Sequence, residues 1–199
     1  MKCIGFLLLF ILSTCWAQAD DRRCDPTEFL EAYCIKPSLT NPEITTFNDE
    51  HFVTFRKDEA GQPQPLMVFM PGTTGVPPGP LLFLRAAANH GYRVISLDYN
   101  DIPSVTTVCH QKEPACSAQM RHMRIYGNNQ MGLDIDNTRP EAIVERLYKL
   151  LQYLDKTYPT QGWSAYYDKQ GMVWDKIALS GQSQGAGMAA FIEIGRAHV

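Results

Sequence analysis

Several features that would assign the sequence to a common class of protein are missing from it. Its 199 residues contain no cluster of Lys and Arg, no internal repeat, no low-complexity tract and no N-x-S/T acceptor. A basic cluster is the usual mark of a protein that binds phosphate backbones, so nucleic acid is not an expected partner. The missing acceptor gives no sign of N-linked glycans.

A long hydrophobic run is missing as well. The apolar stretch 4–12 is too short to span a bilayer, which takes about 20 residues. Lys2 precedes it and the small-residue pattern AQA follows at 17–19, an arrangement typical of a secretory signal peptide. We therefore expect residues 1–19 to be removed and the mature protein, with a net charge of −4, to be secreted without stable membrane insertion. A retained membrane anchor is the alternative.

Four cysteines remain beyond the expected signal peptide: Cys24, Cys34, Cys109 and Cys116. An even number in an exported protein indicates disulfides rather than metal ligands. On sequence proximity alone we favour the local pairs Cys24 with Cys34 and Cys109 with Cys116, and four free thiols are the alternative. The cysteines and nearby histidines match no zinc-ligand spacing, so no metal site is expected.

The distribution of apolar residues predicts an α/β fold. Of all residues, 45 % are apolar, enough for a buried core, and the length suggests one domain or part of one. The short apolar runs 66–70 (LMVFM) and 94–99 (VISLDY) are typical of strands buried on both faces. Between them, residues 81–89 (LLFLRAAAN) predict a helix that ends at a glycine. This βαβ unit predicts a mostly parallel sheet with helices on both faces.

Less regular segments flank this unit on both sides. Residues 51–56 alternate as a half-buried strand would, whereas residues 20–42 show no periodicity and predict an irregular lead-in tied by a disulfide. Residues 101–137 interrupt the pattern, and we interpret them as an insertion over the sheet edge, with a helix at 117–125.

The pattern resumes with a helix expected from Pro140, which suits a first turn. Its apolar stripe comprises Ile143, Val144, Leu147, Leu150, Leu151 and Leu154. An aromatic-rich loop follows at 163–174. This loop and the insertion are candidates to shape a substrate pocket, with simple packing as the alternative.

The sequence GQSQG at 181–185 fits the motif G-x-S-x-G, which is diagnostic only between a strand and a helix. Here KIAL at 176–179 predicts the strand and AGMAAFI at 186–192 predicts the helix. In so sharp a turn, side chains two residues from the serine would collide, so glycine is needed on both sides. Ser183 is therefore the candidate nucleophile, and a tight glycine turn without chemistry is the alternative.

Two backbone N–H groups are candidate donors to an oxyanion beside this serine. The N–H of Gln184 would lie at the N-terminus of the predicted helix. A second donor must come from a loop that follows an earlier strand, and residues 70–75 (MPGTTG) are placed to supply it. We expect the Thr73 N–H to serve, with Thr74 next, and a plain turn is the alternative.

Three segments, LMVFMPGTTG, LLFLRAAANHGYRVISLDY and KIALSGQSQGAG, occur in the order in which the α/β-hydrolase superfamily uses them. The sequence resembles that superfamily over about residues 66–192, although Gln182 stands where many members have histidine. The resemblance implies a serine esterase, lipase or peptidase-like enzyme that needs no cofactor and forms an acyl-enzyme on Ser183. A small-molecule or lipid ester is the expected substrate. A peptidase or amidase on the same fold, and a non-catalytic secreted binding protein, are the alternatives.

In this superfamily an acid and then a histidine follow the serine. The sequence offers Glu193 and His198, but His198 would lie about 20 Å from Ser183 on a continuing helix. Residues 194–199 (IGRAHV) match the translation of a common sequencing adapter, and we exclude them from the fold. Residues 20–193 are therefore expected to form a partial α/β-hydrolase domain, incomplete at the C-terminus, inactive as written and with a central strand left as an unpaired edge.

The remaining polar candidates precede the serine in the chain. Asp98 ends a predicted strand and is expected to serve loop structure or the substrate pocket. The histidines are interpreted as surface or loop residues: His51, His90, His110 and His122.

Overall fold

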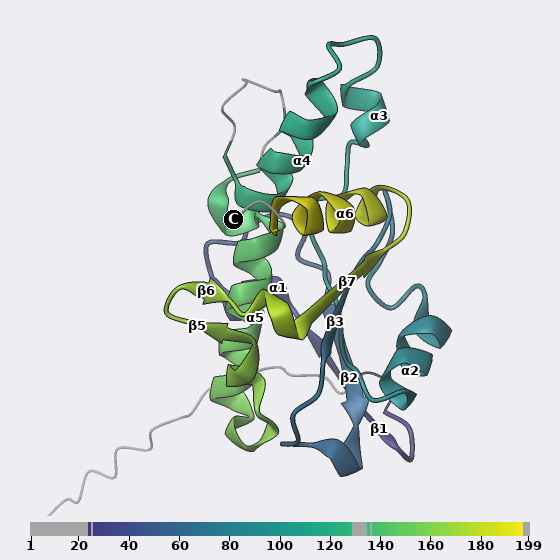
Figure 1. Cartoon of the computed structure of the whole chain (residues 1–199), viewed down its shortest axis with the longest axis vertical. Helices are drawn as coiled ribbons and strands as arrows, with labels where there is room; N and C mark the ends of the chain where they lie inside the picture. Colours follow the sequence, from purple (N-terminus) through teal and green to yellow (C-terminus); the bar gives the residue numbers. More distant parts are fainter. Residues whose placement is uncertain (1–23, 25, 129–134, 136, 197–199) are drawn as a thin grey trace, which may run out of the picture.

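The alternation of strand-forming and helix-forming segments gives an α/β protein. The computed structural model describes residue 24 and residues 26–128, 135 and 137–196. The expected signal peptide and His198 lie outside this described part. A mixed five-stranded sheet lies between α2 on one side and α5 on the other, and α4 and α6 lie at one end (Figure 1).

The elements follow one another along the whole described chain. The strands are β1 Leu30–Ile35, β2 His51–Arg56, β3 Leu66–Met70, β4 Arg93–Ser96, β5 Tyr167–Asp168, β6 Gly171–Met172 and β7 Ile177–Gly181. The α-helices are α1 Pro37–Thr40, α2 Leu81–Asn89, α3 Val105–Val108, α4 Cys116–Tyr126, α5 Ile143–Thr157 and α6 Gln184–Arg196. Short 3-10 helices cover Lys57–Glu59, Arg139–Glu141, Pro159–Gln161, Trp163–Tyr166 and Trp174–Lys176.

The main sheet has the strand order β1-β2-β4-β3-β7. Strand β3 pairs in parallel with β4 and with β7, whereas β2 pairs antiparallel with β1 and β4. The expected βαβ unit is present, since β3 and β4 are parallel neighbours joined through α2. The sheet is mixed rather than mostly parallel, because the two strands before the βαβ unit run antiparallel. The carboxyl ends of β3, β4 and β7 meet at one edge of the sheet.

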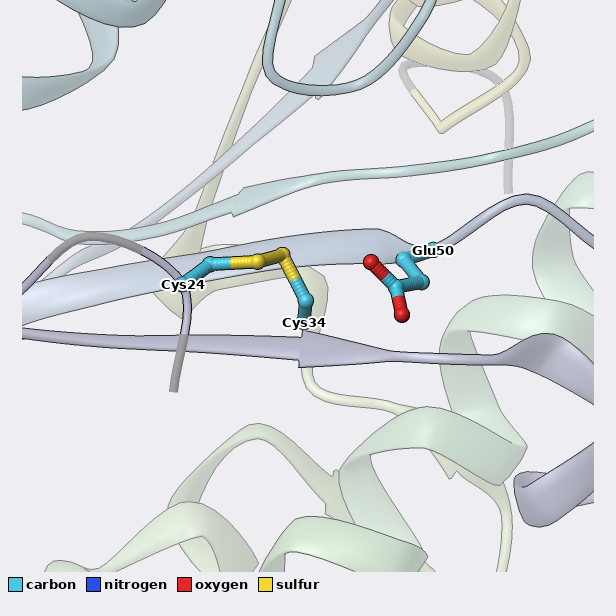
Figure 2. A group of neighbouring side chains, drawn as sticks. All are labelled: Cys24, Cys34 and Glu50. Carbon is cyan, nitrogen blue, oxygen red and sulfur yellow. A yellow bond between two sulfur atoms is a disulfide. The ribbon is translucent and has the colours of Figure 1, made fainter. Parts of the chain in front are cut away.

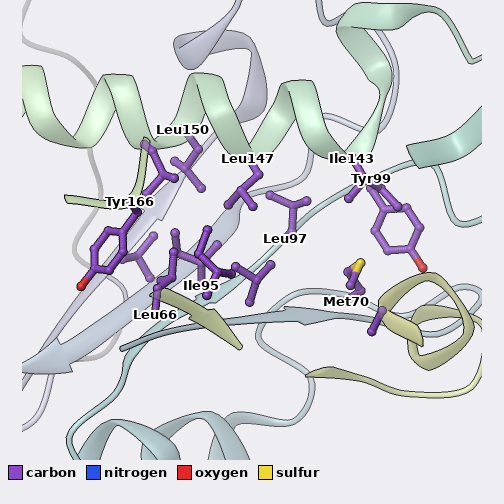
Figure 3. Packing of buried hydrophobic residues seen from close by; sticks show 14 of the residues in the cluster. Leu66, Met70, Ile95, Leu97, Tyr99, Ile143, Leu147, Leu150 and Tyr166 are labelled. Atoms are coloured by element: carbon purple, nitrogen blue, oxygen red, sulfur yellow. The ribbon is translucent and has the colours of Figure 1, made fainter. Parts of the chain in front are cut away.

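Successive side chains of each strand point to opposite faces, and this alternation divides the core in two. On one face, Leu66 and Ile95 lie under Leu147 and Leu150 of α5 (Figure 3). On the other face, Met67, Phe69 and Val94 pack against Leu84 and Ala88 of α2. Each fully buried leucine contributes roughly 1.5 to 3 kcal/mol to the free energy of unfolding.

Several expected elements are confirmed. The strand at 66–70 and the helix at 81–89 have the expected bounds, and the helix expected at 117–125 extends by one residue at each end. The irregular lead-in at 20–42 is wrong, since it contains β1, which pairs with β2 along its full length. Five of the six β1 residues are buried, so the strand shows no alternation of apolar and polar residues that would identify it.

Two further expectations need correction. Strand β2 was expected to be half-buried, but α2 and α5 cover its two faces and only Arg56 is partly exposed. The helix expected from Pro140 begins instead at Ile143, because Ala142 is extended, with ψ 146°, and separates a 3-10 turn from α5. The apolar stripe of α5 faces the sheet as expected, with Val144 only partly buried.

The aromatic loop belongs to the core at the far end of the sheet from Ser183. Trp163 is fully buried, and its ring packs edge-on against Phe55. The guanidinium of Arg93 lies 4.7 Å from the Trp163 ring centroid. Arg93 pairs with Leu66 at the start of β3, whereas the 181–185 turn follows the ends of these strands. Trp163 therefore packs in the core, which is the alternative that we gave to a role in a substrate pocket.

The described part of the 101–137 insertion stands at the carboxyl ends of the strands (Figure 1). It contains α3 and α4, and α4 packs against α5 and α6. None of the helices that the structure describes is long and apolar enough to cross a membrane.

Strand β7 lies last in the sheet order and pairs only with β3 within the described chain. Ala178 is exposed on the face that carries α2. A hollow of about 360 Å³ separates β7 from α2 and is lined by Met67, Phe83, Ala86, Ala87, Tyr92 and Leu179, among others. As expected, one edge of β7 is unpaired among the residues that the structure describes.

Candidate active site

Ser183 lies on the two-residue connection between β7 and α6. Strand β7 ends at Gly181 and α6 begins at Gln184. Ser183 has φ +50°, in the left-handed region that non-glycine residues rarely adopt. Such backbone strain is frequent at functional sites. The serine is exposed to solvent.

Both glycines of the motif are required by close packing of the backbone. A Cβ atom at Gly181 would lie 2.5 Å from the carbonyl carbon of Gly185. A Cβ atom at Gly185 would lie 2.0 Å from the carbonyl oxygen of Met70 and 2.4 Å from that of Pro71. The Gln182 N–H donates to the Met70 carbonyl at 3.1 Å. The turn is therefore pressed against the end of β3, and only glycine permits this approach.

The loop after β3 lies directly beside the serine. A Cβ atom at Gly72 would come within 3.1 Å of the Ser183 Cβ atom. Residues 72–75 form a turn in which the Gly75 N–H donates to the Gly72 carbonyl at 2.8 Å. Thr74 has φ +62°, the positive value that a type II turn requires at its third residue. The loop expected to supply an oxyanion donor therefore adjoins Ser183.

The three candidate oxyanion donors, the N–H groups of Gln184, Thr73 and Thr74, lie in different surroundings. Gln184 is the first residue of α6, where a backbone N–H has no partner within the helix. The Asp101 Oδ2 accepts from the Gly75 N–H at 3.0 Å. The loop that carries Thr73 and Thr74 is thus bonded to Asp101 at its last residue, and the choice of Thr73 as a donor stays a prediction. Burial raises the pKa of the Asp101 carboxyl, and the hydrogen bond from the Gly75 N–H and the charge of Arg124 partly oppose that rise.

Several residues around the serine were not identified from the sequence. The Gln184 side chain is buried and donates to the Asp101 carbonyl at 2.6 Å. The Tyr99 hydroxyl donates to the Pro71 carbonyl at 2.7 Å. Tyr99 and Asp101 follow β4, whose carboxyl end lies at the same sheet edge as Ser183. Their position after a parallel strand was the one signal that would have found them.

No histidine in the described residues hydrogen-bonds to Ser183. His51 was expected on the surface or in a loop, but it is buried in β2, and its Nδ1 accepts from the Asp98 N–H at 2.9 Å. Burial, and then Arg146, lower the pKa of His51 well below its usual value, so this ring is neutral. His90 follows α2, His110 follows α3, and His122 packs against Tyr126.

Asp98 serves loop and core structure. Its Oδ2 lies 3.6 Å from the buried guanidinium of Arg146, which also pairs with Glu141. Burial raises the pKa of the Asp98 carboxyl to about 8. Glu141 in turn accepts from the N–H groups of Thr45 and Thr46. This cluster holds α5 against the chain that precedes β2.

Both expected disulfides are present in the structure. Cys24 is bonded to Cys34 and Cys109 to Cys116, with Cα–Cα distances of 5.4 and 5.6 Å. Glu50 lies near the first pair, and the three side chains are the one group of potential metal ligands among the described residues (Figure 2). Since the sulfurs are bonded to each other, they are not available as thiolate ligands. One carboxylate alone does not make a metal site.

Comparisons with known proteins assign no family. No family model and no curated protein matches the chain. Among solved structures, the chain is similar to the crystal structure of a protein from Bacteroides fragilis NCTC 9343 that is assigned as an acetyl xylan esterase, with a TM-score of 0.39 and 13 % identity. The match covers 86 % of this chain and 43 % of that one, so the chain spans less than half of the esterase's length. A likeness at this level establishes neither a family nor an activity.

Proposed function

We propose that the chain belongs to a secreted serine hydrolase with an α/β-hydrolase fold, which cleaves carboxylic esters through Ser183. One observation carries the proposal: an exposed serine with φ +50° on a strand-to-helix turn, between two glycines that admit no Cβ atom. A plain glycine turn has no need to hold serine in an unfavourable conformation. The strain is accounted for if the hydroxyl has to be presented at the sheet edge.

The proposed reaction is acyl transfer in two steps. The Ser183 Oγ attacks the ester carbonyl carbon while a general base takes the hydroxyl proton, and collapse of the tetrahedral intermediate expels the alcohol. Water then attacks the acyl-serine and releases the carboxylic acid. The N–H groups of Gln184 and Thr73 are the proposed donors to the oxyanion. Chemistry of this kind proceeds without a cofactor.

The strand order and the cysteines support the other parts of the proposal. A βαβ unit followed by a parallel strand that leads into the serine turn agrees with the order implied by the superfamily resemblance. Two disulfides in a small protein are typical of an oxidising compartment. The substrate is proposed to be an ester of a small molecule or a lipid.

We propose that the general base is not among the described histidines, because none of them is hydrogen-bonded to Ser183 and His51 is buried in β2. In the order implied by the resemblance, the acid and the histidine follow the serine. We therefore propose that the 199-residue chain does not turn over esters by itself. The experiment uses this chain and the product of the full transcript, here called the complete gene product, which sequencing past the codon for Ile192 defines.

A fluorophosphonate probe and a panel of p-nitrophenyl esters test the proposal. We expect the complete gene product to hydrolyse short-chain esters and to carry the probe on the peptide that contains Ser183. Ser183→Ala should abolish both, whereas Ser180→Ala, three residues earlier on β7, should retain both. Labelling and turnover that survive Ser183→Ala would refute the serine mechanism.

The same panel separates the alternatives. Amide substrates that are cleaved faster than esters would assign a peptidase or amidase. Probe labelling absent from the complete product would favour a non-catalytic binding protein. Turnover by the 199-residue chain that depends on Ser183 would refute the proposed position of the base.

A further inference from the structure

The segment 100–105 is held by the helix that begins at the serine turn. The Gln184 Nε2 donates to the Asp101 carbonyl at 2.6 Å, and the Gln184 Oε1 accepts from the Val105 N–H at 2.7 Å. Both bonds are buried, so water does not compete for them and their geometry is well defined. One amide side chain thus fixes both ends of the segment against α6.

A second side chain holds the same segment from α4. Arg124 is fully buried, and its Nη2 donates to the Pro103 carbonyl at 2.6 Å. The same nitrogen lies 3.5 Å from the Asn100 Oδ1. The Nη2 atom thus ties the backbone at Pro103 to α4. The segment is therefore clamped between α4 and α6.

From this clamped segment, the Asp101 carboxylate reaches the loop beside the serine. Its Oδ2 accepts from the Gly75 N–H at 3.0 Å. Thr74 has φ +62°, a conformation that is unfavourable for a β-branched residue. A turn of this kind keeps its shape only when contacts outside it hold it. Asp101 supplies such a contact at the fourth residue of the turn, directly after Thr74.

We propose that Asp101 is a positioning residue for the oxyanion site: its carboxylate fixes the 72–75 turn that carries Thr73, and its carbonyl fixes the side chain of Gln184. This inference rests on the proposed function. The two oxyanion donors come from segments far apart in the sequence, and Asp101 bonds to both segments. It touches neither the reacting atoms nor the substrate.

The expected size of the effect follows from the geometry that an oxyanion site requires. Donors must lie within about 2.7 to 3.1 Å of the developing charge, and loss of one donor costs about 10² to 10³ in kcat. A displacement of about 1 Å costs about 10². Removing the Asp101 carboxylate releases the turn but leaves the donors in the chain. We therefore expect kcat to fall about 10-fold to 100-fold, with KM within about threefold of its original value.

The experiment uses the complete gene product and the variants Asp101→Ala, Asp101→Asn and Ser183→Ala. Asp101→Asn keeps one acceptor oxygen and nearly the same side-chain volume, so this variant should retain more activity than Asp101→Ala. If Asp101→Ala does not fold, Asp101→Asn should still fold and be measurable. Asp155→Asn is the matched control, because Asp155 accepts from Ser164 and Tyr167 near the other end of α5. Its kcat should equal that of the wild type.

Affinity for a boronic acid distinguishes positioning from a merely structural role. A boronate bound to the serine is tetrahedral and uses the oxyanion donors, so its affinity should fall in the same proportion as kcat in both Asp101 variants. An unchanged boronate affinity in the Asp101 variants would overturn the inference. A kcat within threefold of the wild type in both Asp101→Asn and Asp101→Ala would overturn it as well. In either case, loss of turnover in Ser183→Ala would still uphold the proposed function. Turnover by Ser183→Ala would instead refute the proposed function itself.

Discussion

Gly72 lies directly against Ser183, because a Cβ atom at Gly72 would come within 3.1 Å of the Ser183 Cβ atom and of the Gln182 carbonyl oxygen. The two residues belong to loops that follow different strands, β3 and β7. Parallel pairing of these strands brings their carboxyl ends together, in register from Leu66 with Ile177 to Met70 with Gly181. The sheet thus sets the distance between the serine and the loop beside it.

Gly72→Ala should reduce the reactivity of Ser183 more than it reduces stability. The added methyl group must displace either the 72–75 loop or the serine by a few tenths of an ångström, and the alignment of the nucleophile is sensitive to such shifts. We expect at least about a tenfold loss of kcat for the complete gene product, at a cost of less than about 2 kcal/mol in the free energy of unfolding. Ester kinetics and urea denaturation measure the two effects.

Gly79→Ala is the control for this substitution. A Cβ atom at Gly79 would meet the Val76 carbonyl oxygen, also at 3.1 Å, but not the serine. It should cost similar stability and leave kcat unchanged. Equal losses of kcat in both variants would contradict the role given to the contact between Gly72 and Ser183.

Gly185→Ala should prevent normal folding, whereas Gly187→Ala should not. The methyl group at Gly185 would overlap the backbone carbonyl oxygens of Met70 and Pro71, which cannot move without breaking the sheet. We expect a loss of at least about 3 kcal/mol. The methyl group at Gly187 would meet only the flexible Arg121 side chain, at 3.1 Å, and alanine favours a helix by up to about 1 kcal/mol.

Thermal unfolding of the two variants tests this contrast. Gly187→Ala should unfold within a few degrees of the wild type, and Gly185→Ala should unfold far below it or fail to accumulate as folded protein. Wild-type stability of Gly185→Ala would show that the turn is not pressed against β3.

The parts of the fold that depend on local pattern were predictable from the sequence. The strand at 66–70 and the helix at 81–89 were correctly bounded because apolar runs and glycine signals lie within the segment itself. The serine turn was predictable for the same reason, since two glycines flanking Ser183 report a local steric requirement. Strand β1 was missed because burial on both faces removed its alternation.

The network around the serine was not predictable, because it depends on contacts between distant segments. Asp101 meets Gly75, and Gln184 meets Asp101 and Val105, only after the strands have paired. The aromatic loop at 163–174 was expected either to shape a pocket or to serve packing, and the fold places Trp163 in the core at the end of the sheet opposite Ser183. Sequence pattern predicts the sharp turn at Ser183 more readily than it predicts the contacts that hold this turn.

The buried Asp98 should make folding stability depend on pH. Burial raises the folded-state pKa of its carboxyl to about 8, from a usual value of 3.8, with Arg146 opposing the rise and Asp49 and Asp101 adding to it. Between these values the folded protein retains a proton that the unfolded chain has released, so stability decreases as pH rises through this window. Asp98→Asn does not titrate and should escape this loss.

Urea denaturation at pH 5, 6, 7 and 8 measures the effect. The free energy of unfolding of Asp98→Asn, relative to the wild type, should increase with pH by up to about 1.4 kcal/mol per unit. Asp58→Asn is the control: the Arg56 hydrogen bond lowers the pKa of Asp58, so its difference from the wild type should stay constant above pH 5. A difference that shrinks for Asp98→Asn as pH rises would show that the ion pair with Arg146 outweighs burial.

The unpaired edge of β7 should cause the 199-residue chain to self-associate. Its sequence, IALSG, carries no charge and no proline, the devices by which natural edge strands avoid pairing with other chains. Ala178 is exposed on this strand, so Ala178→Lys introduces a charge without disturbing the core. We expect this variant to remain monomeric at concentrations at which the wild-type chain associates.

Ala190→Lys on the exposed surface of α6 is the matched control, since it adds the same charge away from the edge. Both substitutions bring the negative net charge closer to zero, which by itself favours association. A lower tendency to associate in Ala178→Lys alone must therefore come from blocking the edge. Light scattering against concentration measures it, and equal association of the two variants would contradict pairing through β7.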